Sequence, residues 1–127
     1  MAGINYASGD RCVIIGNGPS LNTHDLRKIR NVPKFGVNGY FYKAKETGIN
    51  PDFYTVEDTH VMRENVNEIN NVSAKIKFFP SMYRKYIYNT ENVIYFNMNR
   101  GFYENRGESN ENPRFSYDCA KRIYCGQ

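Results

Sequence analysis

The sequence contains no tryptophan, and only two histidines and three cysteines occur among its 127 residues. Cys12, Cys119 and Cys125 are odd in number and lack CxxC spacing, so they indicate neither a disulfide framework nor a zinc site. His24 and His60 have no spacing to Cys, Asp or Glu that defines a metal site or a catalytic triad. We therefore predict no metal site, assign no catalytic residue, and expect reduced thiols, with Cys12 in the core and both histidines structural or exposed.

Long apolar runs and long basic runs are also missing. No window approaches the roughly 18 apolar residues of a membrane span, and residues 1–10 lack the apolar stretch of a signal peptide. The net charge of +4 comes from scattered Lys and Arg, which does not favour a nucleic-acid partner or a membrane patch. We expect a cytoplasmic protein without a transmembrane segment, attracted modestly to anionic ligands.

Short apolar runs alternate with helical patterns along the chain, and 40% hydrophobic residues can supply one core. We expect a single domain over residues 1–127 with an α/β, Rossmann-like fold, in which helices cover both faces of a mostly parallel sheet. Residues 97–114 are rich in Asn, Gly, Glu and Arg and predict a long flexible loop, for which a lid over a ligand is the favoured use. The predicted strands are 12–15, 34–38, 52–56, 75–79 and 92–96, and the predicted helices follow residue 21 and cover 40–47, 61–69 and 115–125.

The first predicted strand ends in Gly16-Asn17-Gly18-Pro19-Ser20-Leu21. A buried strand, a glycine-containing loop and a helix start place backbone N–H groups where phosphates are stabilised. Gly16 and Gly18 permit tight backbone conformations and close ligand approach, Pro19 suits a first helical turn, and the Ser20 hydroxyl can donate to a phosphate. Leu21 replaces the third glycine of the dinucleotide fingerprint, and no Walker lysine is present. A tight strand-to-helix turn without a ligand is the alternative interpretation.

The run from Val13 to Leu21 resembles the opening of bacterial sialyltransferases that use a CMP-sugar donor. It is also similar to bacterial proteins of motility-accessory and pterin-diphosphokinase-like type, which share this opening on a Rossmann-like fold. Two further segments resemble the same group, Phe35-Gly36-Val37-Asn38-Gly39-Tyr40-Phe41-Tyr42 and Pro51-Asp52-Phe53-Tyr54-Thr55-Val56-Glu57-Asp58. The resemblance implies that Asn38, Gly39 and Asp58 lie at the nucleotide together with residues 16–20.

The resemblance implies the donor-binding portion of a nucleotide-sugar-dependent glycosyltransferase, with a CMP-sugar as substrate, a saccharide acceptor and no required cofactor. An acidic residue at Asp58 is more like the diphosphokinase-like branch, where it could help to hold Mg²⁺ near phosphates. A nucleotide-dependent diphosphotransferase and a non-catalytic nucleotide-binding or assembly module are therefore the alternatives, and Asp58 could instead cap the next helix.

The sialyltransferase-like resemblance implies that the catalytic base would follow residue 127. We therefore expect a chain truncated at its C-terminus and leave open whether it is an enzyme. A truncated sheet exposes an edge, so homo-oligomers are expected as well.

Overall fold

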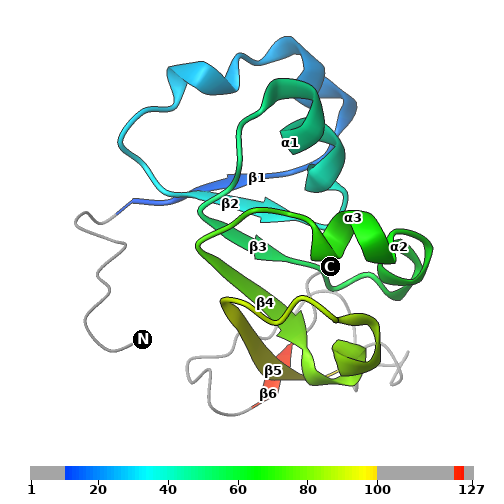
Figure 1. Cartoon of the computed structure of the whole chain (residues 1–127). Helices are drawn as coiled ribbons and strands as arrows, with labels where there is room; N and C mark the ends of the chain where they lie inside the picture. Colours follow the sequence, from blue (N-terminus) through cyan, green and yellow to red (C-terminus); the bar gives the residue numbers. More distant parts are fainter. Residues whose placement is uncertain (1–10, 100–121, 125–127) are drawn as a thin grey trace, which may run out of the picture.

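The computed structural model describes residues 11–99 and 122–124, which form a six-stranded parallel sheet whose strand order follows the chain (Figure 1). Each strand pairs only with its neighbours in the sequence. The α/β, Rossmann-like fold with a parallel sheet is confirmed. The strands are β1 (Val13–Ile15), β2 (Lys34–Val37), β3 (Phe53–Thr55), β4 (Ile76–Pro80), β5 (Val93–Asn99) and β6 (Arg122–Tyr124).

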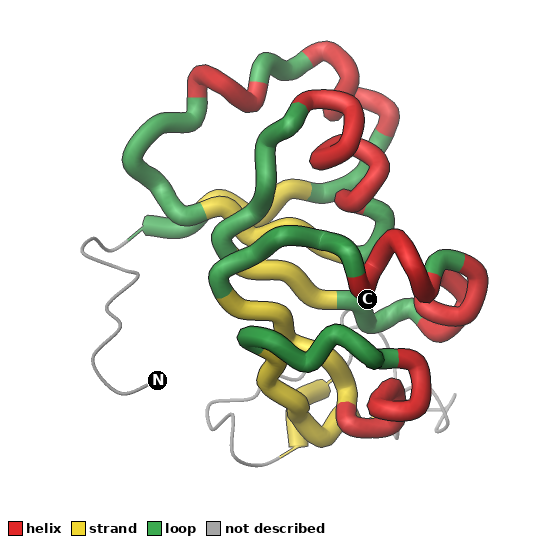
Figure 2. Tube along the Cα trace, in the orientation of Figure 1, coloured by secondary structure: helices red, strands yellow, loops and turns green. Residues whose placement is uncertain are grey.

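Short helices connect the successive strands from β1 to β5 (Figure 2). The helix predicted at 40–47 is confirmed, and it ends at Gly48, whose φ of 73° is the left-handed conformation that glycine adopts readily. The helix predicted over 61–69 is two helices, because Asn65 leaves helical geometry while its side chain donates to the Val61 carbonyl. The α-helices are α1 (Tyr40–Thr47), α2 (Thr59–Glu64) and α3 (Val66–Asn70), and the 3₁₀ helices are η1 (Pro19–Thr23), η2 (Leu26–Lys28) and η3 (Ser81–Tyr86).

The C-terminal predictions differ from the structure. Residues 122–124 belong to the predicted helix 115–125, but they form β6, which pairs in parallel with β5. Pairing with a neighbouring strand outweighs a weak helical pattern, because strand formation depends strongly on context. Residues 97–99 of the predicted loop extend β5, and residues 100–114 lie outside the described residues.

Every described helix packs against the same face of the sheet, whereas the sequence favoured helices on both faces. The ring of Tyr40 on α1 lies against Gly36 of β2, and the Lys77 ammonium of β4 donates to the Asn70 carbonyl of α3. Right-handed crossovers explain this arrangement from β1 to β5, because strands that are added in one direction with the same handedness keep their connections on one side of the sheet. No helix in the described ranges is long and apolar enough to cross a membrane.

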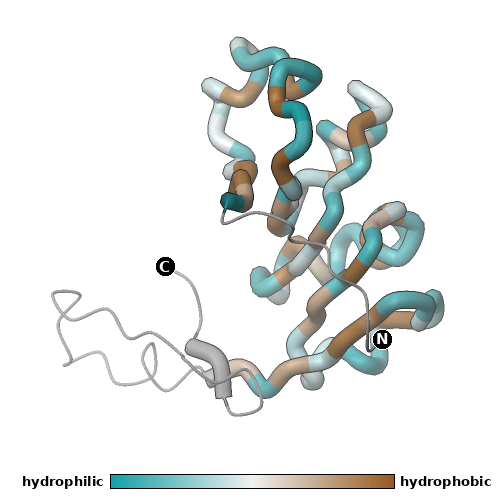
Figure 3. The backbone as a smooth tube through the Cα atoms, turned by 90° about the vertical axis from the view of Figure 1, so that its left-hand side faces the viewer, coloured by the Kyte–Doolittle hydropathy of each residue, from teal (hydrophilic) through white to brown (hydrophobic). Residues whose placement is uncertain are grey.

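The core lies between that face and the helices, and apolar residues recur along the strands (Figure 3). The opposite face is apolar as well. On it the rings of Phe35, Phe53 and Phe78 lie with centroids 5.9 to 6.4 Å apart. On the same face, Ile14 of β1 is 73% exposed and Ile94 of β5 is 38% exposed. We refer to this surface as the open face. The buried hydrophobic residues of the core are Ile15, Leu26, Tyr40, Phe41, Tyr54, Val56, Met62, Ile69, Val72, Phe79, Tyr83 and Ile87.

Candidate functional site

The carboxyl ends of β1, β2 and β3 are adjacent, and the predicted nucleotide-binding residues follow these three strands. Hydrogen bonds join the three loops. The Asn17 side-chain amide donates to the Val37 carbonyl at 2.7 Å, and the Asn38 side-chain oxygen accepts from the next loop along the sheet. The structure therefore brings the three predicted segments to one edge of the sheet.

The loop after β1 is exposed from Gly16 to Ser20 and leads into η1. Leu21 N–H donates to the Gly18 carbonyl at 2.9 Å, which closes the turn. The N–H groups of Gly18 and Ser20 make no backbone hydrogen bond to any residue that the structure describes. Exposed N–H groups without protein partners are available to an anion.

The fold does not need the tight backbone conformations that the sequence suggested for Gly16 and Gly18. Gly18 has φ −66° and ψ 159°, a conformation that any residue adopts. A Cβ on Gly16 would meet no heavy atom within 4 Å, and one on Gly18 would meet only the Ser20 hydroxyl at 3.9 Å. Neither packing nor backbone strain requires glycine here. The advantage that glycine still offers at these two positions is that a ligand can approach the backbone closely.

Asn38 joins the loops after β2 and β3. It has a φ of 46°, in the left-handed region that Asn tolerates better than most residues. Its side-chain oxygen accepts from the N–H groups of Glu57 at 3.0 Å and Asp58 at 3.3 Å, and its main-chain oxygen accepts from the Tyr54 hydroxyl at 2.5 Å. Asn38 therefore shapes the edge, and its side-chain NH₂ is the group left for a ligand. Gly39 precedes α1 as its N-cap residue.

Replacing Asn38 with alanine should lower the free energy of unfolding by about 2 kcal/mol, because two N–H groups lose their acceptor and the left-handed backbone becomes strained. Denaturant titration would measure this loss. The matched control is Asn31→Ala, since Asn31 has a φ of 59° without a side-chain hydrogen bond among the described contacts. Equal losses in the two variants would contradict a role for the Asn38 side-chain oxygen.

Asp58 is the N-cap of α2, the alternative that the sequence left open. Its Oδ1 accepts from the N–H groups of His60 at 2.8 Å and Val61 at 3.1 Å. The residue is exposed, and Oδ2 has no hydrogen bond within the described part of the chain. The carboxylate therefore caps a helix with one oxygen and presents the other at the edge of the sheet.

Two buried tyrosines support this edge through hydrogen bonds that the sequence does not reveal. The Tyr54 hydroxyl donates to Asn38, and burial raises the pKa of Tyr54 well above its ordinary value, which keeps the hydroxyl protonated as a donor. The Tyr83 hydroxyl donates to the Glu57 carbonyl at 2.5 Å and lies 2.8 Å from the Thr59 hydroxyl. The loop after β3 is therefore fixed from two sides.

A family model described as 6-hydroxymethylpterin diphosphokinase MptE-like matches residues 3–126. The chain belongs to the MptE-like family. Comparisons with curated proteins and with solved structures found no match. Membership of the MptE-like family supports the pterin-diphosphokinase-like side of the resemblance and gives no support to the sialyltransferase side.

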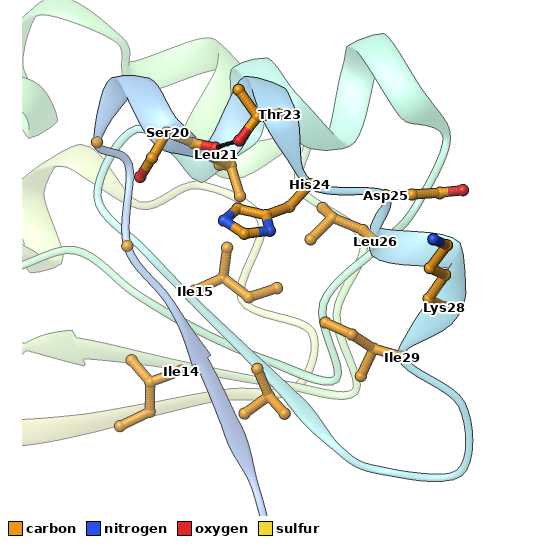
Figure 4. A pocket seen from close by; sticks show the side chains of 13 residues that line it. Ile14, Ile15, Ser20, Leu21, Thr23, His24, Asp25, Leu26, Lys28 and Ile29 are labelled. Atoms are coloured by element: carbon orange, nitrogen blue, oxygen red, sulfur yellow. Dashed lines mark hydrogen bonds between the residues drawn. The ribbon is translucent and has the colours of Figure 1, made fainter.

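A cavity of about 560 Å³ adjoins the loop after β1 in this MptE-like chain. It lies between β1 and the segment that forms η1 and η2, and both Gly16 and Ser20 line it. Figure 4 shows the His24 ring reaching over this groove toward Ile15. The loop after β1 therefore opens directly onto a partly apolar groove.

Within the part of the chain that the structure describes, the histidines and acidic residues form no second candidate site. His24 and His60 are exposed, as expected, and His60 lies 3.2 Å from Glu64 on the same helix. Among residues 11–99 and 122–124, no group of three His, Cys, Asp or Glu could hold a metal ion. The prediction that Cys12 is buried is wrong: Cys12 is exposed because it directly precedes β1, a strand at the end of the sheet. Cys119 and Cys125 lie outside the described residues.

Proposed function

We propose that this MptE-like chain binds the phosphates of a nucleotide on the loop from Gly16 to Ser20, as part of a nucleotide-dependent diphosphotransferase. The bare backbone at Gly16 and Gly18 carries the proposal, because a Cβ on Gly16 would fill only open space and a Cβ on Gly18 would contact only the Ser20 hydroxyl. N–H groups of the same loop lack protein partners in the described structure. The family description supplies the reaction class.

Asp58 fits a role beside the phosphates in this proposal. A lone carboxylate would repel a pyrophosphate, whereas Mg²⁺ is commonly held by one or two carboxylates together with substrate phosphates and water. Oδ2 of Asp58 is exposed at the edge while Oδ1 remains on the helix N-terminus. When bound, the cation would neutralise charge on the phosphate oxygens.

The family description suggests a hydroxymethyl pterin as the acceptor. In the proposed transfer, the acceptor hydroxyl oxygen forms a bond to the β-phosphorus of ATP. The bond between that phosphorus and the α,β-bridging oxygen breaks, AMP leaves with the bridging oxygen, and the hydroxyl proton passes to solvent. The role of this chain is to bind and orient the phosphates, since positioning accounts for much of the catalysis of phosphoryl transfer.

Calorimetric titration with ATP and with CMP, each with and without Mg²⁺, tests the proposal. We expect ATP to bind only when Mg²⁺ is present. CMP binding that needs no metal would overturn the diphosphotransferase assignment in favour of a nucleotide-sugar donor site. A folded chain that binds neither nucleotide would overturn the nucleotide site itself.

Gly16→Ala should weaken ATP binding by about tenfold or more, because the added Cβ lies where the backbone and the phosphates must meet. The variant should keep its melting temperature, since no atom lies within 4 Å of that Cβ. Ser20→Ala should also weaken binding by removal of a hydroxyl donor. Ser73→Ala is the matched control, because Ser73 is exposed and precedes β4, at the amino ends of the strands and away from the loop after β1. Unchanged affinity in folded Gly16→Ala would exclude this loop as the phosphate site.

A further inference from the structure

The outer edge of β1 has backbone groups that no described residue pairs. β1 is the terminal strand of the sheet, and the Val13 N–H donates inward to the Pro33 carbonyl at 2.9 Å. Because backbone groups alternate in direction along a strand, Val13 and Ile15 face β2, whereas the N–H and C=O of Ile14 point outward. This edge can therefore accept another strand at Ile14.

Apolar side chains lie on both sides of that edge. Ile14 lies on the open face and is 73% exposed. On the helix-covered side, the groove beside β1 is lined by Ile15, Leu21, Leu26 and Ile29 (Figure 4). Polar side chains, among them His24, Asp25 and Lys28, also line the same groove. A strand added beside β1 would contact apolar side chains on both of its faces, as strands in parallel sheets do. Such a strand needs a continuous apolar run.

We propose that the added strand is β1 of a second copy of this chain, paired antiparallel across a two-fold axis at Ile14. β1 is itself a continuous apolar run, Val13-Ile14-Ile15, with no charged side chain to oppose self-pairing. The outward N–H and C=O belong to a single residue. A two-fold axis places this residue opposite its copy, so the two Ile14 residues exchange both hydrogen bonds. The contact is self-complementary.

This pairing also reduces the exposure of Ile14. Residues that exchange two hydrogen bonds in an antiparallel pair have Cα atoms about 5.5 Å apart and side chains on the same face. The two Ile14 side chains would therefore contact each other on the open face, while Val13 of each copy would lie opposite Ile15 of the other on the groove side. The proposal is independent of nucleotide binding.

Sedimentation velocity over a range of concentrations tests the self-association. We expect the full chain to shift from one to two copies as concentration rises, and Ile14→Lys to remain monomeric, because a lysine at the edge opposes pairing. Ile94→Lys is the matched control, since Ile94 is also exposed on the open face but lies on β5, far along the sheet. We expect this control to dimerise like the wild type.

Three results would overturn the proposal: a wild-type chain that stays monomeric at all concentrations, Ile14→Lys that still dimerises, or Ile94→Lys that abolishes dimers as fully as Ile14→Lys. The last result would indicate stacking of the open faces instead. Circular dichroism would verify that each variant is folded.

Disulfide trapping tests the register. In a background with all three cysteines replaced by serine, Ile14→Cys should form a covalent dimer under mild oxidation, because a Cα separation near 5.5 Å suits a disulfide. Ile94→Cys in the same background should remain uncrosslinked. Equal crosslinking of the two variants would overturn the Ile14 register.

Discussion

Replacement of Asn70 with alanine should lower the free energy of unfolding by roughly 3–4 kcal/mol, because several buried groups would lose their partners together. Asn70 has no exposed surface. Its side-chain NH₂ donates to the carbonyls of Val66 at 2.8 Å and Tyr86 at 3.0 Å. Its side-chain oxygen accepts from the N–H groups of Tyr88 at 3.0 Å and Asn89 at 3.1 Å. One amide thus joins α3 to the connection between η3 and β5.

Denaturant unfolding would measure the loss, and hydrogen exchange at the Tyr88 and Asn89 amides would locate it. Asn71→Ala is the matched control, since Asn71 is the exposed neighbour of Asn70 and its side chain makes no described hydrogen bond. We expect this control to remain within about 0.5 kcal/mol of the wild type. Similar stability of Asn70→Ala and Asn71→Ala would refute the structural role of the buried amide.

Gly36→Ala should lower the free energy of unfolding by about 1–3 kcal/mol, because the added methyl group overpacks the core. An ideal Cβ at Gly36 would lie 2.6 Å from Cδ1 and 2.9 Å from Cγ of Tyr40. Tyr40 cannot easily move away, because it is fully buried and its hydroxyl donates to the Ile49 carbonyl at 3.0 Å. The contact joins β2 to α1 at van der Waals distance, so an added methyl group must displace the helix or the ring.

A double-mutant cycle with Tyr40→Ala would isolate this contact. Tyr40→Ala alone should destabilise the chain by loss of core packing, but adding Gly36→Ala should then cost little, because the clashing ring is gone. Thermal unfolding of the four proteins would measure the coupling. Additive effects would mean that the penalty at Gly36 does not come from Tyr40.

The alternation of strands and helices was predictable because it depends on local patterns. β1 to β5 each overlap a predicted strand, and α1 has the predicted bounds. The capping alternative for Asp58 was also available from the sequence, since Asp followed by a helical pattern is a frequent N-cap. The strand order and the single covered face were not predictable, because they depend on which strands pair with each other and not on where each strand lies in the sequence.

The polar groups that support the candidate site could not be predicted from one sequence. Tyr54 and Tyr83 are two of eleven tyrosines, and only the tertiary structure brings their hydroxyls to the Asn38 and Glu57 carbonyls. Asn70 likewise reads as one of many polar residues in a short helix. The failure at Cys12 has a similar origin, since an apolar run cannot reveal that its strand ends the sheet.

The strand order has a consequence for how the chain is made. Each new strand pairs with the strand that was synthesised just before it, so strand pairing does not require segments that are far apart in the sequence. Loop closure between near neighbours costs less entropy than closure between distant segments. We expect the sheet to grow outward from β1 during translation, one crossover at a time, so that the candidate phosphate loop is synthesised before the later strands β2 to β5.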